Sequence, residues 1–382
     1  MKLPEFLLDL AKASNQEIYL VGGAVRDLIK RIEMKDFDIL CSKNAISFAK
    51  HLEEKNLAEI IAISEEFCTA KIKWKINEDK FVIMDLATAR SEIYEYPGAL
   101  PKIKFPVLIR KDIARRDFTI NSIVIKLNRS KFYDPFKGMK DLRNRIIRVL
   151  HSKSYIDDPT RIIRAIRFAI KFDFDISPED LKLIEQALAD ERIIGIIKEV
   201  RGIRVGIELK RLFEFDYVAK ALYLMTKLNV WNICALNLKI NMKNLFKHNE
   251  IKSWEIGLFC LFIDNDPSIT FEIFEKLGFT SRVINQLKKI LLLLDVSKIE
   301  ISLKTYKIIE SLEDEFKECL FLLQPQMKTI YNKMKISLPE ISPEELINQG
   351  FKGKAISDEL ENIFKKNYAS FNYNDEKPAF LE

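Results

Sequence analysis

The 382-residue chain has few glycines and histidines, and its cysteines follow no known pattern. With only 11 glycines and abundant Lys, Glu, Leu and Ile, the composition favours a mostly helical protein. The three histidines are far apart, which argues against a histidine-based metal hydrolase and against a phosphohydrolase that needs a His-Asp cluster. Five scattered cysteines without a CxxC pair indicate neither a zinc knuckle nor a disulfide framework. Reduced thiols predict a cytoplasmic protein.

Long hydrophobic runs are also missing. The longest, at residues 256–263, is too short to span a bilayer, and the N-terminus has no signal-peptide pattern. We therefore expect no membrane partner. The net charge of +6 at pH 7 suits a nucleic-acid partner if the basic residues cluster on one face. The length allows two or more hydrophobic cores.

The chain does contain a strand, a glycine turn and a helix in the sequence IYLVGGAVRD, which begins at residue 18. The apolar run stops at Gly22 and Gly23, and the pattern then becomes helical. Backbone N–H groups at such a helix start can hold an anion, and Arg26 in the first turn adds a charged donor for phosphate. A lone GG before a helix is usually a plain turn.

Two carboxylates, Asp36 and Asp38, follow on the next predicted strand. Residues two apart on a strand lie on the same face, so a divalent cation between these side chains relieves their repulsion. A lone DxD is usually a solvated strand end. A phosphate-binding turn beside a carboxylate pair, however, predicts chemistry on a nucleoside triphosphate.

The following residues predict a small α+β sheet domain. We expect helices over residues 1–16 and 43–55 and antiparallel strands over 59–63, 67–74 and 80–86. Asp85, on the last of these strands, is either a third metal-binding carboxylate or an ordinary strand-end aspartate. Residues 90–114 are too proline-rich for a helix and are expected to form a solvated loop or lever, although their basic residues could also touch RNA.

The sequence RRDFTIN places Arg116 and Asp117 after this segment. Arginine can bridge phosphate oxygens, and an aspartate can accept a hydrogen bond from a ribose hydroxyl. A basic helix start is the plainer interpretation. The DPFKG sequence at residues 134–138 predicts a turn.

A second candidate site begins with DDPTR at residue 157. Asp158 suits a helix N-cap. Arg161, Arg164 and Arg167 recur every three residues and form one stripe on an otherwise apolar helix, so we expect them to need anions, which a triphosphate and a base edge would supply. Further on, Arg204 and Glu208 are spaced for an ion pair within one helix.

Six sequences in one order, over roughly residues 18–210, resemble the motifs of a known family. They are GGAVRD, DFD, RRDFTIN, DPFKG, DDPTR and IRVGIEL. The chain resembles polymerase-β-like nucleotidyltransferases, in the form used by class II tRNA nucleotidyltransferases (CCA-adding enzymes) and bacterial poly(A) polymerases. Asp157 departs from the family, which usually has glutamate there. IRVGIEL resembles a helix that braces the base-reading helix, and GFKGKAI from residue 350 resembles a C-terminal glycine motif or is a plain helix-entry loop.

The resemblance implies an α+β head of the polymerase-β type, with a mixed or antiparallel sheet, followed by an all-helical neck, body and tail. We expect a catalytic head over residues 1–140, a neck with the base-reading helix over 141–210, a body over 211–300 and an RNA-binding tail over 301–382. The implied reaction transfers a nucleotide from ATP or CTP to the 3′ end of tRNA, with Mg²⁺ at Asp36 and Asp38 as catalytic residues.

In this scheme a further set of side chains holds the nucleotide. The set comprises Gly22, Gly23, Arg26, Arg116, Asp117, Asp158, Arg161, Arg164 and Arg167. Cytosine and adenine both present an amino donor beside a ring-nitrogen acceptor, which a carboxylate at 158 and a guanidinium at 161 complement. Guanine and uracil present mismatched edges, so they leave buried polar groups unpaired.

Other activities remain open from the sequence. The alternatives are addition of the complete CCA end, of CC only or of A only, and poly(A) synthesis. A catalytically inactive RNA-binding module is the alternative from another class. The partners expected are the acceptor stem and 3′ end of tRNA, ATP and CTP, and no protein partner is implied.

Overall fold

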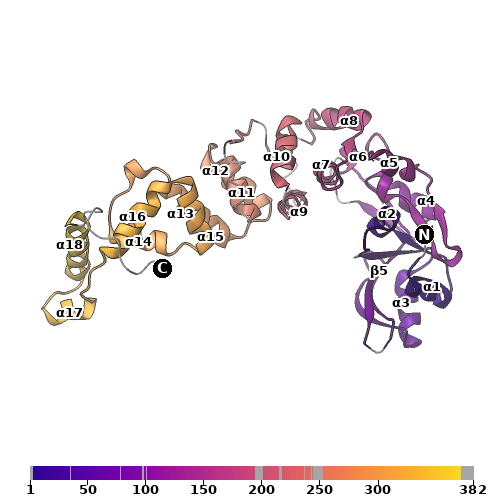
Figure 1. Ribbon diagram of the computed structural model, residues 1–382, viewed down its shortest axis with the longest axis horizontal. Coiled ribbons are helices and arrows are strands. Elements are labelled where there is room, and N and C mark those ends of the chain that lie inside the picture. The colour runs from indigo at the N-terminus through magenta and orange to yellow at the C-terminus, as the bar shows by residue number, and fades with distance from the viewer. Residues whose placement is uncertain are drawn as a thin grey trace. The chain divides into compact units, whose positions relative to one another are not determined.

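The computed structural model describes residues 3–34, 36–77, 79–96, 99, 101–193, 201–214, 217–235, 237–241, 243 and 253–370. The chain divides into two compact units, residues 1–238 and 239–382, which Figure 1 colours from indigo to red and from orange to yellow. The division between them falls inside the body predicted over 211–300. The four-part domain organisation stays a prediction.

The first unit is built on a seven-stranded mixed sheet with the order β3-β4-β5-β2-β1-β8-β9. The β2–β5 pair is parallel and the other pairs are antiparallel. The strands are β1 (Ile18–Val21), β2 (Phe37–Cys41), β3 (Ala58–Ser64), β4 (Thr69–Lys75), β5 (Phe81–Thr88), β8 (Val124–Lys126) and β9 (Lys131–Tyr133). The predicted α+β head with a mixed sheet is confirmed.

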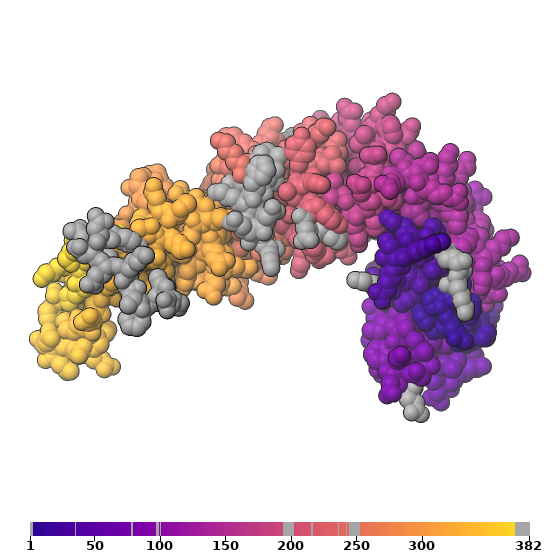
Figure 2. Space-filling model, in the orientation of Figure 1, coloured from indigo at the N-terminus to yellow at the C-terminus, as the bar shows by residue number. Residues whose placement is uncertain are grey.

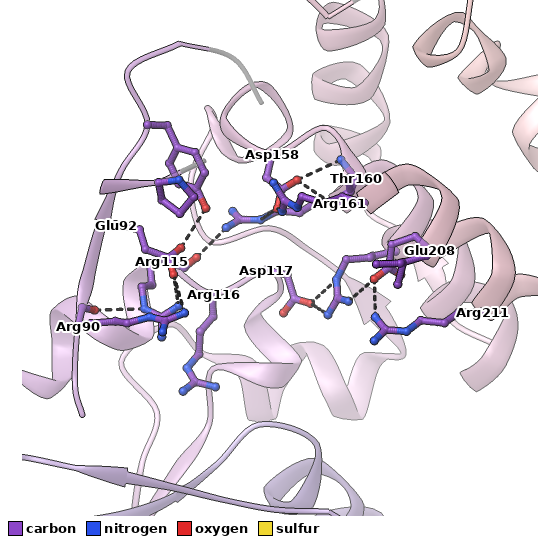
Figure 3. A pocket seen from close by; sticks show the side chains of 15 residues that line it. Arg90, Glu92, Arg115, Arg116, Asp117, Asp158, Thr160, Arg161, Glu208 and Arg211 are labelled. Carbon is purple, nitrogen blue, oxygen red and sulfur yellow. Dashed lines mark hydrogen bonds and ion pairs between the residues drawn. The ribbon is translucent and has the colours of Figure 1, made fainter. Parts of the chain in front are cut away.

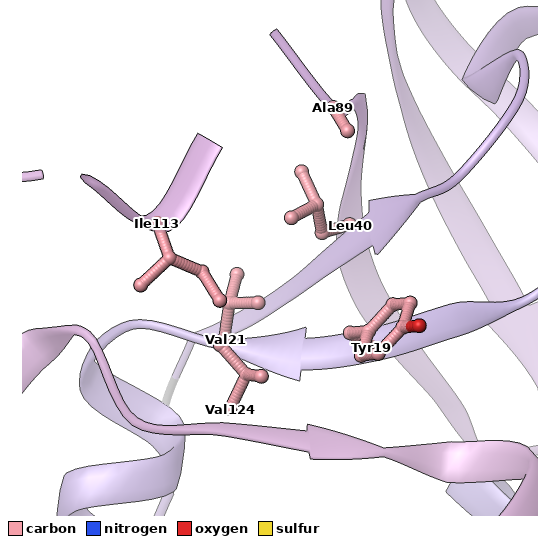
Figure 4. Close-up of a cluster of buried hydrophobic side chains, with 6 residues drawn as sticks. All are labelled: Tyr19, Val21, Leu40, Ala89, Ile113 and Val124. Atoms are coloured by element: carbon pink, nitrogen blue, oxygen red, sulfur yellow. The ribbon is translucent and has the colours of Figure 1, made fainter. Parts of the chain in front are cut away.

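Helices pack on both faces of this sheet. α3 (Ala45–Glu54) buries Phe48 and Leu52 against the face of β3–β5 that carries Ile72 and Met84. On the opposite face, a cluster of buried side chains joins the strands to α4 (Ile109–Ala114). Figure 4 shows this cluster, which consists of Tyr19, Val21, Leu40, Ala89, Ile113 and Val124. It fixes the residues that follow α4 beside the ends of β1 and β2.

The segment 90–114 is more ordered than its prolines predict. It contains the hairpin β6 (Ser91–Ile93) and β7 (Lys102–Lys104) and ends in α4. The expectation that no helix forms here is wrong for its last part, because no proline follows Pro106 and α4 starts after Leu108. Pro97 and Gly98, which contributed to that expectation, lie outside the described residues.

The rest of the first unit is helical, apart from the short parallel pair β10 (Ile146–Ile147) and β11 (Asp175–Ile176). Its further helices are α1 (Glu5–Ala13), α2 (Gly23–Lys30), α5 (Gly138–Asn144), α6 (Ser154–Asp157), α7 (Thr160–Phe172), α8 (Pro178–Leu188), α9 (Arg201–Phe213) and α10 (Val218–Lys227). The turn before α5 needs glycine, because a Cβ on Gly138 would lie 2.0 Å from the carbonyl oxygen of Thr119.

The second unit consists of helices. They are α11 (Trp254–Phe262), α12 (Pro267–Lys276), α13 (Ser281–Leu293), α14 (Leu303–Glu310), α15 (Asp314–Leu323), α16 (Pro325–Ile336), α17 (Pro343–Asn348) and α18 (Lys354–Ser370). Gly350 and Gly353 have positive φ values of 96° and 55° in the loop that enters α18. Among the described residues, no helix has the length and apolar character that a membrane span requires. All five cysteines are free and buried.

Candidate active site

The two glycines after β1 bring the backbone close to a carboxylate and an arginine. Gly22 has φ 71° and ψ −141°, a conformation that other residues rarely adopt. A Cβ on Gly22 would lie 3.1 Å from Asp38 Oδ2 and 3.8 Å from Arg116 Nη1. α2 begins at Gly23, so its unpaired N–H groups start at this turn. The glycine turn, the DxD strand and the RRD motif therefore meet at one place.

The acidic residues of this site lie at the start of β2 and beside it. Asp36 directly precedes β2 and is exposed, whereas Asp38 lies within the strand and is half-buried. Asp38 pairs in register with Asp85 of β5, so both side chains leave the sheet on the same face. Burial raises the pKa of Asp38; Asp85 and Asp36 also raise it, against the lowering effect of Arg116.

This set of oxygen donors fits a hard divalent cation, because a cation offsets the mutual repulsion of the carboxylates. Within the described ranges, no group of three or more His, Cys, Asp or Glu side chains is arranged to hold a metal ion. A cation at Asp36 and Asp38 would therefore need further oxygens from water or from substrate phosphates, as Mg²⁺ usually does.

Asp85 has a second neighbour. Its Oδ1 lies 3.3 Å from Lys71 Nζ, and the two side chains are 54% and 45% exposed. The register beside Asp38 agrees with a third metal-binding carboxylate, and the exposed ion pair agrees with an ordinary strand-end aspartate. Both roles stay predictions.

Asp112 of α4 holds the two arginines of the RRD motif. Its side chain is fully buried, and Oδ2 accepts hydrogen bonds from Arg115 Nε and Nη2 at 3.1 and 2.8 Å. Oδ1 accepts from Arg116 Nη2 at 3.1 Å. Burial acts to raise the pKa of Asp112, but Arg116 and Arg115 outweigh it and the pKa lies below its ordinary value. Asp112 thus fixes Arg116 through its Nη2, while its Nη1 faces the glycine turn.

Both carboxylate oxygens of Asp117 accept hydrogen bonds from other groups of the protein. Oδ1 accepts from the backbone N–H of Phe118 at 2.8 Å and from Asn121 Nδ2 at 3.0 Å. Oδ2 accepts from Arg164 Nη2 at 2.6 Å and Nε at 3.1 Å. Burial acts to raise the pKa of Asp117, but the charge of Arg164 and the hydrogen bonds from Arg164, Asn121 and Phe118 together lower it further. The predicted contact of Asp117 with a ribose hydroxyl stays a prediction.

Asp158 and Arg161 lie where α6 meets α7, and their exposed fractions are 7% and 5%. Asp158 Oδ2 accepts a hydrogen bond from Arg204 Nη2 at 2.6 Å. Its Oδ1 accepts from the backbone N–H of Thr160 at 3.2 Å and from the Thr160 hydroxyl at 2.6 Å. Arg161 donates to Ser154 Oγ at 2.5 Å and to the carbonyl oxygen of Arg115 at 2.7 Å. Both side chains are therefore held in fixed orientations.

The arginine stripe of α7 finds its anions within the protein. Glu208 of α9 accepts from Arg164 Nη1 at 2.8 Å, from Arg167 Nη2 at 3.1 Å and from Arg211 Nη1 at 2.6 Å. Glu208 and Asp117, from segments more than 40 residues away, thus supply anions for Arg164 and Arg167, and the contact of the stripe with a triphosphate and a base edge stays a prediction. Arg204 and Glu208 thus bond to α6–α7 residues, as the predicted bracing helix requires.

Arg26 also makes contacts within the protein. Its Nη1 donates to Asn121 Oδ1 at 2.8 Å, its Nε donates to Asp27 Oδ1 at 2.9 Å, and its guanidinium carbon lies 4.5 Å from the centre of the Phe172 ring. Only 6% of Arg26 is exposed. The side chain joins α2 to α7, and its predicted contact with phosphate stays a prediction.

A cavity of about 540 Å³ is lined by five of the predicted nucleotide-binding residues, and Gly22, Gly23, Asp36 and Asp38 lie outside its lining. It is lined by Arg90, Glu92, Tyr94, Pro101, Arg115, Arg116, Asp117, Asp158, Thr160, Arg161, Arg164, Arg204, Ile207, Glu208 and Arg211. Figure 3 shows Asp158 and Arg161 on one side, and Arg116 extending away from them toward the strands. Arg116 belongs to the cavity and also lies beside Asp38, so it connects the two predicted halves of the site. Arg26 and Arg167 do not line this cavity.

Sequence analysis missed Asp112, Glu92 and Tyr94. Asp112 precedes Arg115 and Arg116 by three and four residues, which is the spacing of ion pairs on a helix, but the prolines nearby led us to expect a loop. Glu92 accepts from Arg115 Nη1 at 2.7 Å and from Tyr94 Oη at 3.0 Å. No sequence pattern indicates these two residues, because the β6–β7 hairpin that carries them meets Arg115 only in the folded protein.

Residues 18–148 match the family model of the poly A polymerase head domain. The chain is 31% identical to an A-adding tRNA nucleotidyltransferase of Aquifex aeolicus, over 90% of this chain and 44% of the relative. It thus spans less than half the length of that curated relative. The structure resembles an apo CCA-adding enzyme with a TM-score of 0.74 and 29% identity, covering 98% of this chain and 94% of the other.

A CCA-adding enzyme of Thermotoga maritima in complex with tRNA is also similar, with a TM-score of 0.69 and 28% identity over 96% of this chain and 91% of the other. The match of the head domain, the ordered motifs and the likeness over nearly the whole fold agree with one another. Residues 18–148 form a head domain of the poly A polymerase family, and the chain is similar over nearly its whole fold to CCA-adding enzymes, in agreement with the motifs of class II tRNA nucleotidyltransferases and bacterial poly(A) polymerases.

Proposed function

We propose that this chain is a template-independent RNA nucleotidyltransferase that adds C and/or A residues of the CCA end to tRNA. The 3′-hydroxyl of the RNA attacks the α-phosphorus of CTP or ATP, and pyrophosphate leaves. The observation that carries this proposal is the single cavity that joins Asp158 and Arg161 to Arg116, whose guanidinium lies beside Asp38 and Gly22. One nucleoside triphosphate can then contact both ends.

The base is selected by two buried side chains in this proposal. Asp158 accepts from the amino group of cytosine or adenine, and Arg161 donates to the adjacent ring nitrogen. Their bonds to Arg204, Ser154 and the backbone hold both groups before the nucleotide binds, which favours a single base geometry. A guanine or uracil edge leaves one of these buried groups unpaired.

The phosphates are proposed to lie at the glycine turn. Arg116 and the first N–H groups of α2 face the same place, next to Gly22 and Gly23. Arg26 adds positive charge beside Gly23, whereas Arg164 and Arg167 on α7 are proposed to lie on the sugar side, where Asp117 orients Arg164. Positioning of this kind keeps the attacked phosphorus in line with the RNA hydroxyl.

A head domain of the poly A polymerase family implies a divalent metal, and we propose Mg²⁺ at the catalytic residues Asp36 and Asp38. When bound, the ion offsets charge on the leaving pyrophosphate and makes the attacking hydroxyl more acidic. Burial raises the pKa of Asp38 most, and Asp85 and Asp36 raise it further; a cation at this position would offset the repulsion between these carboxylates.

The RNA partner is proposed to be tRNA. We retain the head, neck, body and tail of residues 1–140, 141–210, 211–300 and 301–382 as a functional division, in which the helical parts hold the acceptor stem by shape and backbone contacts. The similarity to a CCA-adding enzyme complexed with tRNA supports this assignment. The five free cysteines agree with a reducing compartment, and we place the activity in the cytoplasm.

A narrower candidate is addition of the terminal A alone. The Aquifex aeolicus relative, which matches 90% of this chain, is named an A-adding enzyme. The similar solved structures are instead named CCA-adding enzymes, which favours the broader activity.

Product length separates these activities. Purified protein is incubated with a tRNA that lacks all three terminal nucleotides, or with one that ends in CC, and with labelled CTP or ATP separately. Complete CCA addition extends both substrates, A addition extends only the second, and a poly(A) polymerase gives long products from ATP. No extension of either RNA would overturn the proposed function.

A further inference from the structure

A strip of basic and apolar side chains follows β4 and β5 away from the carboxylates. Lys71, Lys73 and Lys75 alternate along β4 and pair in register with Asp85, Ile83 and Phe81 of β5. Cross-strand partners leave an antiparallel pair on the same face, so all six side chains share one face of the sheet. Because Asp85 is also the register partner of Asp38, the strip begins at the metal-binding end. We call the three lysines with Ile83 and Phe81 the lysine strip.

The lysine strip lies on the face opposite α3. Along β4 and β5, the alternate residues Ile72 and Met84 are fully buried toward α3, whereas Phe81 and Ile83 are 52% and 48% exposed. In Figures 1 and 2 these strands form the lower part of the first unit, in purple. Phe81 and Ile83 therefore present apolar surface beside the lysines.

The charges and shape of the lysine strip suit a single-stranded polyanion. Lys73 Nζ lies 4.2 Å from the centre of the Phe81 ring, and neither Lys73 nor Lys75 forms an ion pair with a described residue. At the far end, the described residues that line a hollow of about 450 Å³ include Lys73, Lys75 and Lys80, together with Phe81 and the carboxylate of Glu59. Lysines for phosphates with an aromatic ring for a base are the elements of single-strand binding sites.

The order of the strands fixes which part of the substrate this strip can meet. β2, with Asp38, lies between β1 and β5. The glycine turn and Arg116, where the proposed nucleotide lies, are on the β1 side of β2. An RNA strand whose 3′-hydroxyl reaches the carboxylates must therefore extend away from them on a side of β2 that the nucleotide does not occupy. The side of β5 and β4 is the one that carries the lysines.

We propose that the lysine strip binds the single-stranded 3′ end of the RNA substrate, with Lys73 and Lys75 contacting phosphates and Phe81 stacking on a base. The proposal rests on the proposed nucleotidyl transfer to RNA and assigns the surface that guides the RNA end to the carboxylates. It predicts that changes in the strip affect the RNA and leave the nucleotide unaffected.

The experiment uses the full chain, ATP, and an acceptor-stem minihelix whose unpaired 3′ end finishes in CC. We compare the wild type with Lys73→Gln/Lys75→Gln and with Phe81→Ala. Losing two phosphate contacts reduces the slope of log affinity against log salt by about 1.4, which is roughly a tenfold to thirtyfold weaker affinity at 0.1 M salt. Loss of stacking in Phe81→Ala raises KM for the minihelix at least about fivefold. KM for ATP stays unchanged in both variants.

Lys50→Gln is the matched control, because Lys50 is an exposed lysine of α3 on the other side of the sheet. It removes the same charge and leaves the salt slope and both KM values unaltered. Phe81→Leu, which keeps apolar volume but cannot stack, separates stacking from packing, and circular dichroism checks the fold of each variant.

Two different failures are distinguishable. If the wild type adds no nucleotide to the minihelix or to tRNA, the proposed function fails. If the wild type is active but the lysine variants keep the wild-type KM for RNA and the wild-type salt slope, the lysine strip does not bind the RNA end. A rise in KM for ATP in place of that for RNA also overturns the assignment.

Discussion

The two ends of the candidate site differ in how their charges are balanced: the Asp158 end lines the cavity, and the Asp38 end lies beside Arg116. At the Asp158 end, buried carboxylates and guanidiniums pair with one another across α6, α7 and α9. At the Asp38 end, carboxylates lie side by side on one face, and Arg116 Nε is buried without a hydrogen-bond partner. The first end is organised by the chain alone, whereas the second needs a cation and phosphates to balance it. In the proposed function, base selection therefore uses side chains that the protein itself holds in place, whereas catalysis depends on a bound cation and the phosphates.

The largest effect is expected from the Asp38 end. Asp38→Asn removes a proposed metal ligand, so kcat/KM for nucleotide addition falls by about a thousandfold or more. A single-turnover assay with labelled ATP measures this loss. Asp9→Asn, a half-exposed residue of α1 that pairs with Lys12 away from the site, is the control and keeps full activity. Retention of most activity by Asp38→Asn would contradict the assignment of the carboxylate pair.

The Asp158 end is tested through selectivity. Asp158→Asn replaces an acceptor by an amide that can also donate, so discrimination against UTP and GTP weakens and kcat/KM for CTP and ATP falls about 10- to 100-fold. Incorporation of each of the four nucleotides is measured separately. Asp175→Asn, an exposed residue of β11, leaves the ratios unaltered. Unchanged ratios in Asp158→Asn would show that another group selects the base.

Glu208 tests whether the Asp158 end is held together by the protein itself. Glu208→Gln leaves Arg164, Arg167 and Arg211 without their shared anion, and Glu208 is only 5% exposed. Breaking a buried pair costs several kcal/mol; because Arg164 and Arg211 are partly exposed, we expect about 1–3 kcal/mol. Calorimetry then shows a melting temperature several degrees lower. Glu214→Gln, an exposed neighbour in the same chain segment, does not change it.

The smallest effect concerns pH. The pKa of Asp117 is lowered in the folded protein, because the charge of Arg164 and the hydrogen bonds that Asp117 accepts together outweigh the opposing effect of burial. A lowered carboxyl pKa stabilises the fold fully above the unfolded value of about 3.9, and this stability is lost as the pH falls through the folded pKa. Asp117→Asn is therefore less stable than the wild type at neutral pH, and the difference between their unfolding free energies shrinks below about pH 3.9. A constant difference down to pH 3 would contradict the ion pair.

The contrast between the ends also explains what sequence alone could predict. Gly22, Asp36 and Asp38 belong to one continuous segment, where backbone conformation and strand alternation follow from local rules. The strand at residues 18–21 and the three meander strands are therefore close to their observed bounds. The arginine stripe on α7 was also predicted correctly as a helix face.

The partners of that stripe could not be predicted. Asp117 is 47 residues from Arg164, and Glu208 is 44 residues from it, so only the packing of α7 against α9 and the end of α4 brings them together. Asp112 was missed for a local reason, since the nearby prolines concealed a short helix. Helical spacing after the last proline was the signal that would have found it.

A crystal structure of the protein with CTP and Mg²⁺ tests most directly whether one nucleotide contacts both the Asp158–Arg161 pair and the glycine turn beside Asp38. We predict the triphosphate beside Gly22, Asp38 and Arg116, with the cytosine edge bonded to Asp158 and Arg161. Electron density for a base outside the cavity, with Asp158 and Arg161 still bonded only to protein groups, would contradict it.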